Sequence, residues 1–387
     1  MEGWTNLKLG EVLKLEYGKP LPKERRSDNG AFPAYGANGI KCRTNDVYWE
    51  KSSIVVGRKG SAGEINLADG GFWPLDVTYF VVFDEDEYDL RFLYYLLSQL
   101  NLPSLAKGVK PGLNRNDVYA IEQHFPPLPE QERIVAILDE AFAAIATATA
   151  NAEKNLANAR ELFESQLDAV ASSVTGYPHE LINEFSVDFN RGRSRHRPRN
   201  EAKLYGGDYP FVQTGDIRGS NHWVHNYKQT YSEAGLLQSK LWPTGTVCIT
   251  IAANIAETGI LTFAGCFPDS IIGVVVDEER MSNEFLEYML QAAKSRLQRE
   301  GEGAAQDNIN LGTFKSQKFP VPPLTKQIQL VKVLNSSAEA ASHLDRLARD
   351  KFAHLADLKQ SLLHKAFTGE LTADAKAADR SLSEAGV

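Results

Sequence analysis

The chain has little cysteine, and the cysteines it has follow no pairing pattern. Its 387 residues contain three, Cys42, Cys248 and Cys266. Disulfide frameworks and zinc sites need cysteine or histidine pairs at short spacings, so neither is expected here. The first residues lack the basic and apolar regions of a signal peptide, and no apolar run approaches the length of a membrane span. We therefore expect a cytoplasmic protein that does not contact a membrane.

Recognisable catalytic motifs are missing as well. The segment Arg58-Lys59-Gly60-Ser61-Ala62-Gly63 is rich in glycine but departs from the pattern of a phosphate-binding loop. A partial nuclease-like set around Pro268-Asp269 lacks the required lysine, and Pro126-Pro127 and Pro322-Pro323 lack the flanking residues of an adenine-methylating motif. No histidine or cysteine pair has the spacing of metal ligands. These absences weigh against a self-contained methyltransferase or nuclease.

An excess of positive charge is also absent, since the formal net charge is −8. Nucleic-acid binders usually carry a basic excess, so this balance favours a scaffold whose domains bind proteins. The basic residues are unevenly spread, however. One run alternates through the second half: Arg191, Arg193, Arg195, Arg197 and Arg199. A protein can have a basic face and remain acidic overall, so a DNA-binding interpretation stays open.

Proline and glycine are absent from two long stretches, residues 130–175 and 324–368. Each stretch follows a proline-rich opening, Phe125-Pro126-Pro127-Leu128-Pro129 or Phe319-Pro320-Val321-Pro322-Pro323. Proline ends the preceding element and is tolerated in a first helical turn. Apolar or small residues then recur at steps of three and four, as in a coiled-coil seam. The pattern predicts two helices, each about 60–70 Å long at 1.5 Å per residue.

The same plan occurs twice along the chain. Pro323-Leu324 follows Pro127-Leu128 at a spacing of 196 residues, and Asp269 follows Asp76 at a spacing of 193. We predict tandem α/β (α+β) domains, each followed by a long helix, with the two helices forming an antiparallel coiled-coil spacer of pseudo-twofold symmetry. The expected divisions are domain one at 1–128, the central helix at 129–176, domain two at 177–323, the distal helix at 324–370 and a flexible tail at 371–387.

Polar and basic loops carry the candidate DNA contacts. We expect a turn-rich loop over Phe32–Ile40, a basic turn after the strand Ser53–Gly57, and a second basic loop over residues 107–114. The first-half candidates are Tyr35, Asn38, Arg58, Lys59, Lys107 and Lys110. The second-half candidates are Arg193, Arg195, Arg197, Thr214, Asp216, Asn254, Gln306 and Asn308. Each could instead be structural or solvated, and the arginine run could be a charged loop. Gln131 and Gln327 are candidates for partner docking or for capping a helix start.

Several motifs resemble those of the specificity subunits of type I restriction–modification systems. The opening of the first long helix is one of them. The others are Tyr35-Gly36-Ala37-Asn38-Gly39, Val56-Gly57-Arg58-Lys59-Gly60-Ser61-Ala62-Gly63, Thr214-Gly215-Asp216-Ile217 and Phe367-Thr368-Gly369-Glu370-Leu371. The resemblance covers essentially the whole chain. The second helix opens differently, with Thr325-Lys326-Gln327 where the first has Pro129-Glu130-Gln131.

The resemblance implies a function for each part. Each globular half would be a target recognition domain that binds one half of a bipartite, asymmetric site in double-stranded DNA. The helices would set the unread spacer and dock two modification subunits, which use S-adenosylmethionine to methylate adenine at N6. A restriction subunit would add cleavage that depends on ATP and Mg. No cofactor and no catalytic residue is expected in this chain.

Overall fold

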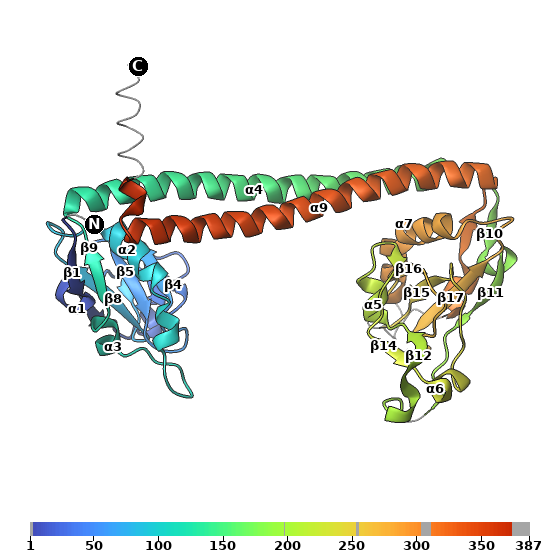
Figure 1. Ribbon diagram of the computed structural model, residues 1–387, viewed down its shortest axis with the longest axis horizontal. Helices are drawn as coiled ribbons and strands as arrows, with labels where there is room; N and C mark the ends of the chain where they lie inside the picture. Colours follow the sequence, from blue (N-terminus) through green and yellow to red (C-terminus); the bar gives the residue numbers. More distant parts are fainter. Residues whose placement is uncertain (1–2, 197, 253–254, 303–310, 374–387) are drawn as a thin grey trace, which may run out of the picture. The chain divides into compact units, whose positions relative to one another are not determined.

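The computed structural model describes residues 3–196, 198–252, 255–302 and 311–373. The chain forms two compact units, one of residues 1–152 with 349–387 and the other of residues 153–348. The division runs through both long helices, α4 (Leu128–Ser173) and α9 (Leu324–Phe367). Each unit therefore joins one mixed α/β domain to a segment of each long helix (Figure 1).

The first domain is built on an antiparallel sheet of four strands in the order β2-β8-β5-β6. The strands are β2 (Leu13–Tyr17), β8 (Thr78–Phe83), β5 (Ser53–Gly57) and β6 (Ile65–Ala68). All five residues of β5 are buried, as its unbroken apolar run predicts for a central strand. A separate ribbon pairs β1 (Thr5–Lys8) with β9 (Glu122–Phe125), which brings the start of the chain beside the segment that enters α4.

Short helices close the first domain around this sheet. They are α1 (Leu9–Val12), α2 (Leu90–Gln99), α3 (Arg115–Tyr119) and the 3-10 turns η1 (Lys23–Arg25) and η2 (Leu102–Leu105). The apolar face of α2 packs into a core that also contains Ile134 and Leu138 of α4 and Phe367 of α9. The first domain and the adjoining helix segments therefore share one hydrophobic core.

The segment expected as a turn-rich loop is a β-hairpin, so that prediction was wrong. Strands β3 (Phe32–Gly36) and β4 (Gly39–Thr44) pair antiparallel, and β7 (Trp73–Pro74) joins them in a three-stranded sheet. Gly39 has φ = 107°, a conformation that glycine adopts readily at a hairpin turn. Asn38-Gly39 between extended residues was the signal for a hairpin, and only its turn was recognised.

The second domain contains a five-stranded sheet in the order β11-β17-β15-β16-β13. The strands are β11 (Ser186–Arg191), β17 (Ile271–Val276), β15 (Val247–Thr250), β16 (Thr258–Leu261) and β13 (Trp223–Val224). The remaining pairs are β10 (His179–Leu181) with β18 (Lys318–Pro320) and β12 (Tyr205–Phe211) with β14 (Gln229–Tyr231). Its first four sheet strands repeat the connectivity of β2-β8-β5-β6, and β10-β18 repeats β1-β9.

Helices of the second domain follow the same plan with additions. They are α5 (Thr214–Arg218), α6 (Glu233–Leu237), α7 (Asn283–Glu302), α8 (Leu311–Ser316), η3 (Ile182–Glu184) and η4 (Ala202–Leu204). Helix α7 corresponds to α2, since Phe285 and Leu286 are fully buried as are Phe92 and Leu93. The core again includes residues of both long helices, among them Leu167 and Leu334.

The two long helices match the predicted bounds within a few residues. In α4, every position of the predicted coiled-coil seam is buried or half-buried, whereas most intervening positions are exposed. The seam consists of Ile134, Leu138, Ala141, Ile145, Ala148, Ala152, Leu156, Ala159, Phe163, Leu167 and Val170. In α9 the seam fails at Leu344, which is 40% exposed. By length and composition alone, α4 is also the one helix among the described residues that could cross a membrane. Its alanine-rich middle accounts for that composition, and its two ends contribute to the cores of folded domains.

Candidate nucleic-acid interface

Two basic loops of the first domain are joined into one structure. The turn after β5 and the loop over residues 107–112 are connected by backbone hydrogen bonds, from Gly60 N–H to Pro111 O at 3.1 Å and from Leu113 N–H to Arg58 O at 2.9 Å. Residues 107–112 close on themselves as a hairpin through two 3.1 Å bonds between Lys107 and Gly112. Four of the predicted DNA contacts, Arg58, Lys59, Lys107 and Lys110, therefore lie on one connected surface.

The lysines of this surface are the solvent-accessible part of it. Lys59 and Lys110 are exposed. Lys107 is also exposed, and its Nζ lies 2.9 Å from a carboxylate oxygen of Asp117. Exposed lysines on flexible stems suit phosphate oxygens, which need charge rather than a fixed hydrogen-bonding geometry.

Arg58 is held more firmly than the lysines. Its Nη2 donates to the carbonyl oxygen of Asp76 at 2.5 Å, whereas its buried Nε has no hydrogen-bond partner among the described residues. Its guanidinium lies 5.3 Å from the ring centre of Tyr17 and 6.0 Å from that of Tyr79. These contacts fix the orientation of Arg58 before any ligand arrives.

Sequence reasoning missed a second arginine on the same aromatic ring. The guanidinium of Arg115, the first residue of α3, lies 5.1 Å from the ring centre of Tyr17, which is 46% exposed. Arg115 follows Asn114 directly after the basic loop, so its position beside that loop was the available signal. Its contact with Tyr17, a residue far away in the sequence, could not be read from local pattern.

The hairpin residues predicted as contacts have different surroundings. Asn38 is exposed in the turn between β3 and β4. Tyr35 is only 8% exposed and packs edge-on against Phe72 with ring centres 5.7 Å apart. Burial raises the pKa of the Tyr35 phenol. The structure thus places Asn38 at the surface and gives Tyr35 a position in the core.

The arginine run of the second domain follows the end of β11. Arg193 and Arg195 are exposed, and the backbone N–H of Arg193 donates to Phe267 O at 3.1 Å. Arg199 is engaged with both carboxylate oxygens of Asp269, at 2.9 and 3.0 Å. Arg197 lies outside the described residues.

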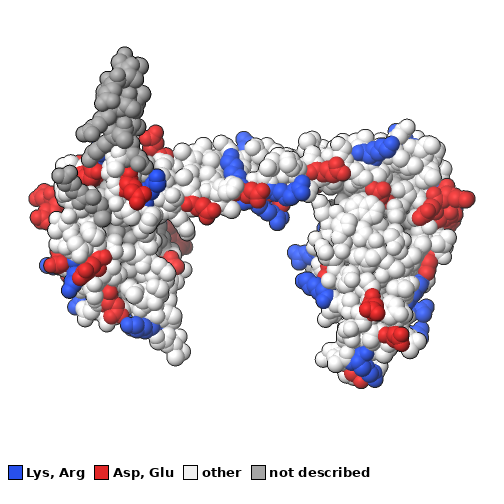
Figure 2. Space-filling view, in the orientation of Figure 1, with Lys and Arg blue, Asp and Glu red and all other residues white. Residues whose placement is uncertain are grey.

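The other second-domain candidates are only partly described. Thr214 and Asp216 are half-buried at the start of α5, and an Asp216 carboxylate oxygen accepts from the Gln213 backbone N–H at 2.9 Å. This bond organises the beginning of a helix. Asn254, Gln306 and Asn308 lie outside the described residues. Figure 2 shows acidic and basic side chains mixed over the visible face of each unit.

Gln131 and Gln327 are fully buried and have the same surroundings in both halves. The Gln131 amide nitrogen donates to the carbonyl oxygens of Glu87 (3.0 Å) and Pro126 (2.9 Å), and its oxygen accepts from Asp89 N–H (3.0 Å). The Gln327 amide makes the equivalent three bonds. Its nitrogen donates to Arg280 O at 2.9 Å and Pro322 O at 2.8 Å, and its oxygen accepts from Ser282 N–H at 2.8 Å. Each glutamine connects the start of its long helix to the loop before α2 or α7. The amide nitrogen and oxygen of each side chain therefore have hydrogen-bond partners within their own half.

A tyrosine in each half joins α2 or α7 to its long helix. The Tyr95 hydroxyl donates to the Asp139 carboxylate, which also accepts from Arg91 Nη2 at 2.8 Å. We call this set, Arg91, Tyr95 and Asp139, the first tyrosine bridge. Burial, the larger cause, and the neighbouring Asp139 raise the pKa of Tyr95, so its hydroxyl stays protonated and can donate.

The second tyrosine bridge consists of Glu284, Tyr288 and Asn335. The Tyr288 hydroxyl donates to Asn335 Oδ1 at 2.6 Å, and Asn335 Nδ2 donates to Glu284 Oε2 at 2.8 Å. Burial, together with the nearby Glu287 and Glu284, raises the pKa of Tyr288. The tyrosine is retained at the corresponding place in the repeat, whereas arginine and aspartate are replaced by glutamate and asparagine.

The second domain also contains a buried polar network. His222 Nδ1 lies 2.6 Å from Glu287 Oε2, and Glu287 is fully buried. Thr258 and Gln291 donate to Glu287 Oε1 at 2.6 and 2.7 Å. His222 has φ = 74° and stacks on Tyr288 with ring centres 4.5 Å apart. The network stiffens the contact between the sheet and α7, close to the second tyrosine bridge.

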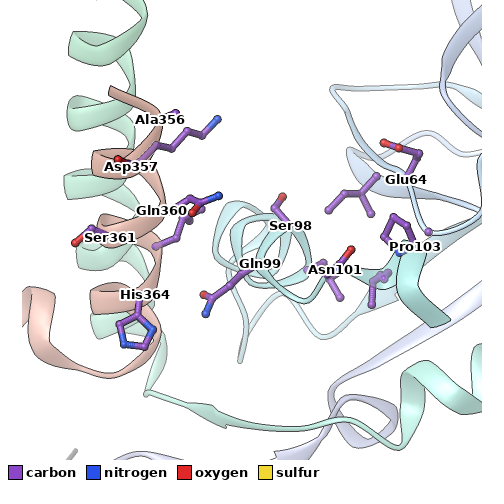
Figure 3. A pocket seen from close by; sticks show the side chains of 16 residues that line it. Glu64, Ser98, Gln99, Asn101, Pro103, Ala356, Asp357, Gln360, Ser361 and His364 are labelled. Atoms are coloured by element: carbon purple, nitrogen blue, oxygen red, sulfur yellow. The ribbon is translucent and has the colours of Figure 1, made fainter. Parts of the chain in front are cut away.

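A groove of about 1060 Å³ lies in the first unit between the end of α2 and the last turns of α9. Figure 3 shows Ser98 and Gln99 on one side and Gln360 and His364 on the other. Polar side chains such as Gln360 and His364 share the lining with apolar ones such as Ile65, Leu97 and Leu363. Among the described residues, no group of three or more His, Cys, Asp or Glu side chains is placed to hold a metal ion.

Tandem mixed α/β domains, each followed by a long helix, define a duplicated architecture that solved structures share. One, described as the structural basis of complex assembly and conformational transition of the type I R-M system, has a TM-score of 0.73, 18% identity, and coverage of 96% of this chain and 99% of its own. The HsdS subunit from Thermoanaerobacter tengcongensis has a TM-score of 0.58 and 19% identity, covering 96% and 98% of the two chains. These likenesses establish the fold.

Sequence comparison establishes the family. The family model described as "Type I restriction modification DNA specificity domain" matches residues 1–156 and 188–343. This chain therefore belongs to the type I restriction–modification specificity subunits. A putative specificity subunit from Haemophilus influenzae is 28% identical over 338 residues, 82% of each chain. The EcoDI specificity subunit of Escherichia coli is 23% identical over 418 residues, 97% of this chain and 90% of the relative. The resemblance inferred from the motifs is confirmed, and with it a DNA-binding role in a restriction and modification system.

Proposed function

We propose that each domain of this chain binds one half of a bipartite, asymmetric DNA site. The observation that carries the proposal is the duplicated framework with different loops. Both halves share the sheet order, the buried glutamine and the tyrosine bridge, yet the loops around them differ. Two related domains with unlike loops suit two unlike segments of one duplex. Phosphate contacts by the exposed basic residues would position the duplex, and side chains at base edges would give sequence preference.

The long helices would set the unread spacer as an antiparallel coiled coil. Two sets of contacts support this arrangement. In the first unit, Ala366 and Phe367 near the end of α9 share a core with Ile134 and Leu138 near the start of α4. In the second unit, Arg160 of α4 forms a 2.8 Å ion pair with Asp345 of α9. Residue numbers thus rise along one helix as they fall along the other, which also supports a pseudo-twofold relation between the halves.

We further propose that the helices dock two adenine-N6 methyltransferase subunits and, through them, a restriction subunit. Several large apolar side chains of α4 and α9 are exposed and would be covered by such partners: Leu162, Ile328, Val333, Leu347 and Leu358. S-adenosylmethionine, ATP and Mg would be bound by the partners, and this chain would be a non-catalytic subunit in the cytoplasm. The target adenine would leave the duplex for a partner's pocket.

Strand-resolved mapping of N6-methyladenine in the source cell, with and without this gene, tests the proposal. We expect one gapped, two-part motif to lose methylation when the gene is deleted and to regain it on complementation. A methylome that is unchanged by deletion, in cells that express the chain together with a methyltransferase subunit bound to it, would contradict the proposal.

A further inference from the structure

Arg58 and Arg115 both lie beside the Tyr17 ring but differ in their hydrogen bonding. Arg58 is committed to the protein through its hydrogen bond to Asp76 O. Arg115 contacts the Tyr17 ring, and among the described residues its guanidinium has no hydrogen-bond acceptor. Stacking on an aromatic ring fixes the plane of a guanidinium while leaving its N–H edge available. Arg115 is half-buried beside this ring, and its N–H groups are therefore available next to the two basic loops.

The backbone beneath Arg115 is fixed as well. Asn114 caps α3, since its side-chain oxygen accepts from Asn116 N–H at 3.0 Å. At the other end of the helix, the Tyr119 hydroxyl accepts from Leu15 N–H at 2.7 Å. Leu15 lies two residues before Tyr17 on β2, so α3 and the ring that supports Arg115 are held to the same strand.

We propose that Arg115 is a base-reading residue of the first domain and that Tyr17 is its positioning residue. A planar, oriented guanidinium can donate two parallel hydrogen bonds to O6 and N7 of guanine, which a lysine cannot reproduce. The exposed Lys59 and Lys110 beside it would bind phosphates. This inference rests on the proposed function and adds the base class that one half-site contains.

The second-domain sequence has no arginine at either corresponding position. At the repeat spacing, Leu311 stands where the first domain has Arg115, and the buried Ile251 stands where it has Arg58. The guanine contact is thus expected in only one of the two half-sites, which agrees with an asymmetric target.

The test is selection of a randomised duplex library by the full-length chain in the presence of its methyltransferase partner, with sequencing of the bound fraction and titration of single duplexes over a salt series. We expect Arg115→Lys, which keeps the charge, to lower discrimination at one guanine by about 10- to 100-fold. The salt dependence should remain unchanged. Tyr17→Ala should have the same selective effect, and Tyr17→Phe, which keeps the ring, should retain the preference.

Lys110→Ala is the matched control. It should reduce the log–log salt slope by about 0.9 and leave the base preference intact. If Arg115→Lys folds like the wild type and keeps the full preference, or weakens binding to all sequences equally, Arg115 does not read a base. If the wild-type chain itself shows no sequence preference in the presence of its methyltransferase partner, the proposed function fails instead.

Discussion

The two halves of the chain resemble each other in their supporting contacts and differ in the surfaces that surround them. Gln131 and Gln327 make the same three hydrogen bonds, and Tyr95 and Tyr288 join corresponding helices. The first domain has a cluster of basic loops with Arg58 and Arg115 beside the Tyr17 ring, whereas the second-domain sequence has Ile251 and Leu311 at the positions of these arginines. The network around Glu287 occurs only in the second, where the first has Tyr94 at the corresponding position. Duplication has preserved how each domain is held to a helix and has left the remaining surface free to diverge.

The largest expected effect on stability comes from substituting Glu287, which has no counterpart in the first domain. Replacing Glu287 by Leu removes the partner of the buried His222 and the acceptor of the half-buried Thr258 and Gln291, which should destabilise the second domain by about 3–5 kcal/mol. Urea unfolding of the full chain, followed by domain-resolved hydrogen exchange, measures this loss. Tyr94→Leu is the control at the matching position and should cost about 1 kcal/mol. Equal losses for the two variants would show that the network contributes nothing specific.

The two buried glutamines test the similarity of the halves, because the same substitution at each should destabilise its domain by the same amount. Gln131→Leu and Gln327→Leu each leave three backbone groups unpaired, with an expected loss of about 2–4 kcal/mol in the respective domain. Glu132→Gln, at an exposed neighbouring position of α4, should be neutral. Hydrogen exchange of the amides of Asp89 and Ser282 reports the two sites separately. A large effect in one half alone would mean that the same set of hydrogen bonds contributes unequally to the stability of the two domains.

Exchanging the polar partner of a tyrosine bridge should change how the free energy of unfolding of that half depends on pH. Asn335→Asp places a carboxylate beside Glu284 and should cost about 1–2 kcal/mol at pH 8. Repulsion raises the pKa of the carboxyl pair in the folded state above its unfolded value. The loss should therefore be absent below the unfolded pKa and develop as pH rises through the folded pKa.

The reciprocal change Asp139→Asn removes a half-exposed ion pair and should cost about 0.5–1 kcal/mol near neutral pH. Urea unfolding at a series of pH values measures both variants. A cost for Asn335→Asp that does not depend on pH would contradict the repulsion between carboxylates.

A further small effect concerns Asp188 on β11, which corresponds in the strand ladder to Lys14 on β2. Burial acts to raise the pKa of Asp188, but hydrogen bonds from Lys240 and Asn190 and the charge of Lys240 outweigh it, so the pKa is lowered. Such a group stabilises the fold above its unfolded pKa, and the contribution is lost as pH falls through the folded pKa. Asp188→Asn should remove about 1 kcal/mol at pH 7 and less at pH 3, as thermal unfolding would show. A difference that grows toward acid would contradict this assignment.

Local pattern was sufficient for the parts of the fold that depend on local chemistry. Pro127 and Gly176 bracket the first long helix, and the strand Ser53–Gly57 was predicted with the bounds the structure gives. The Phe32–Ile40 hairpin was missed because proline and glycine there were taken as loop formers. In the candidate site, Arg58 and Lys107 were expected on separate loops, since only long-range backbone pairing brings those loops together. Arg115 was missed because its partner Tyr17 lies on β2, about a hundred residues earlier in the sequence, and only the folded domain brings the two together.

The tyrosine bridges have a consequence for how new target preferences could arise by recombination. Arg91 lies near the start of α2, after strands β1 to β8 and the Asn38 turn but before the second basic loop and β9. A crossover upstream of Arg91 would exchange the Asn38 turn and the first basic loop while each domain kept the polar partners that join it to its long helix. A crossover between Tyr288 and Asn335 that delivered the first helix would place Glu284 beside Asp139, and the two carboxylates would repel. The different charges of the two tyrosine bridges would therefore favour hybrids in which the crossover lies upstream of the bridge.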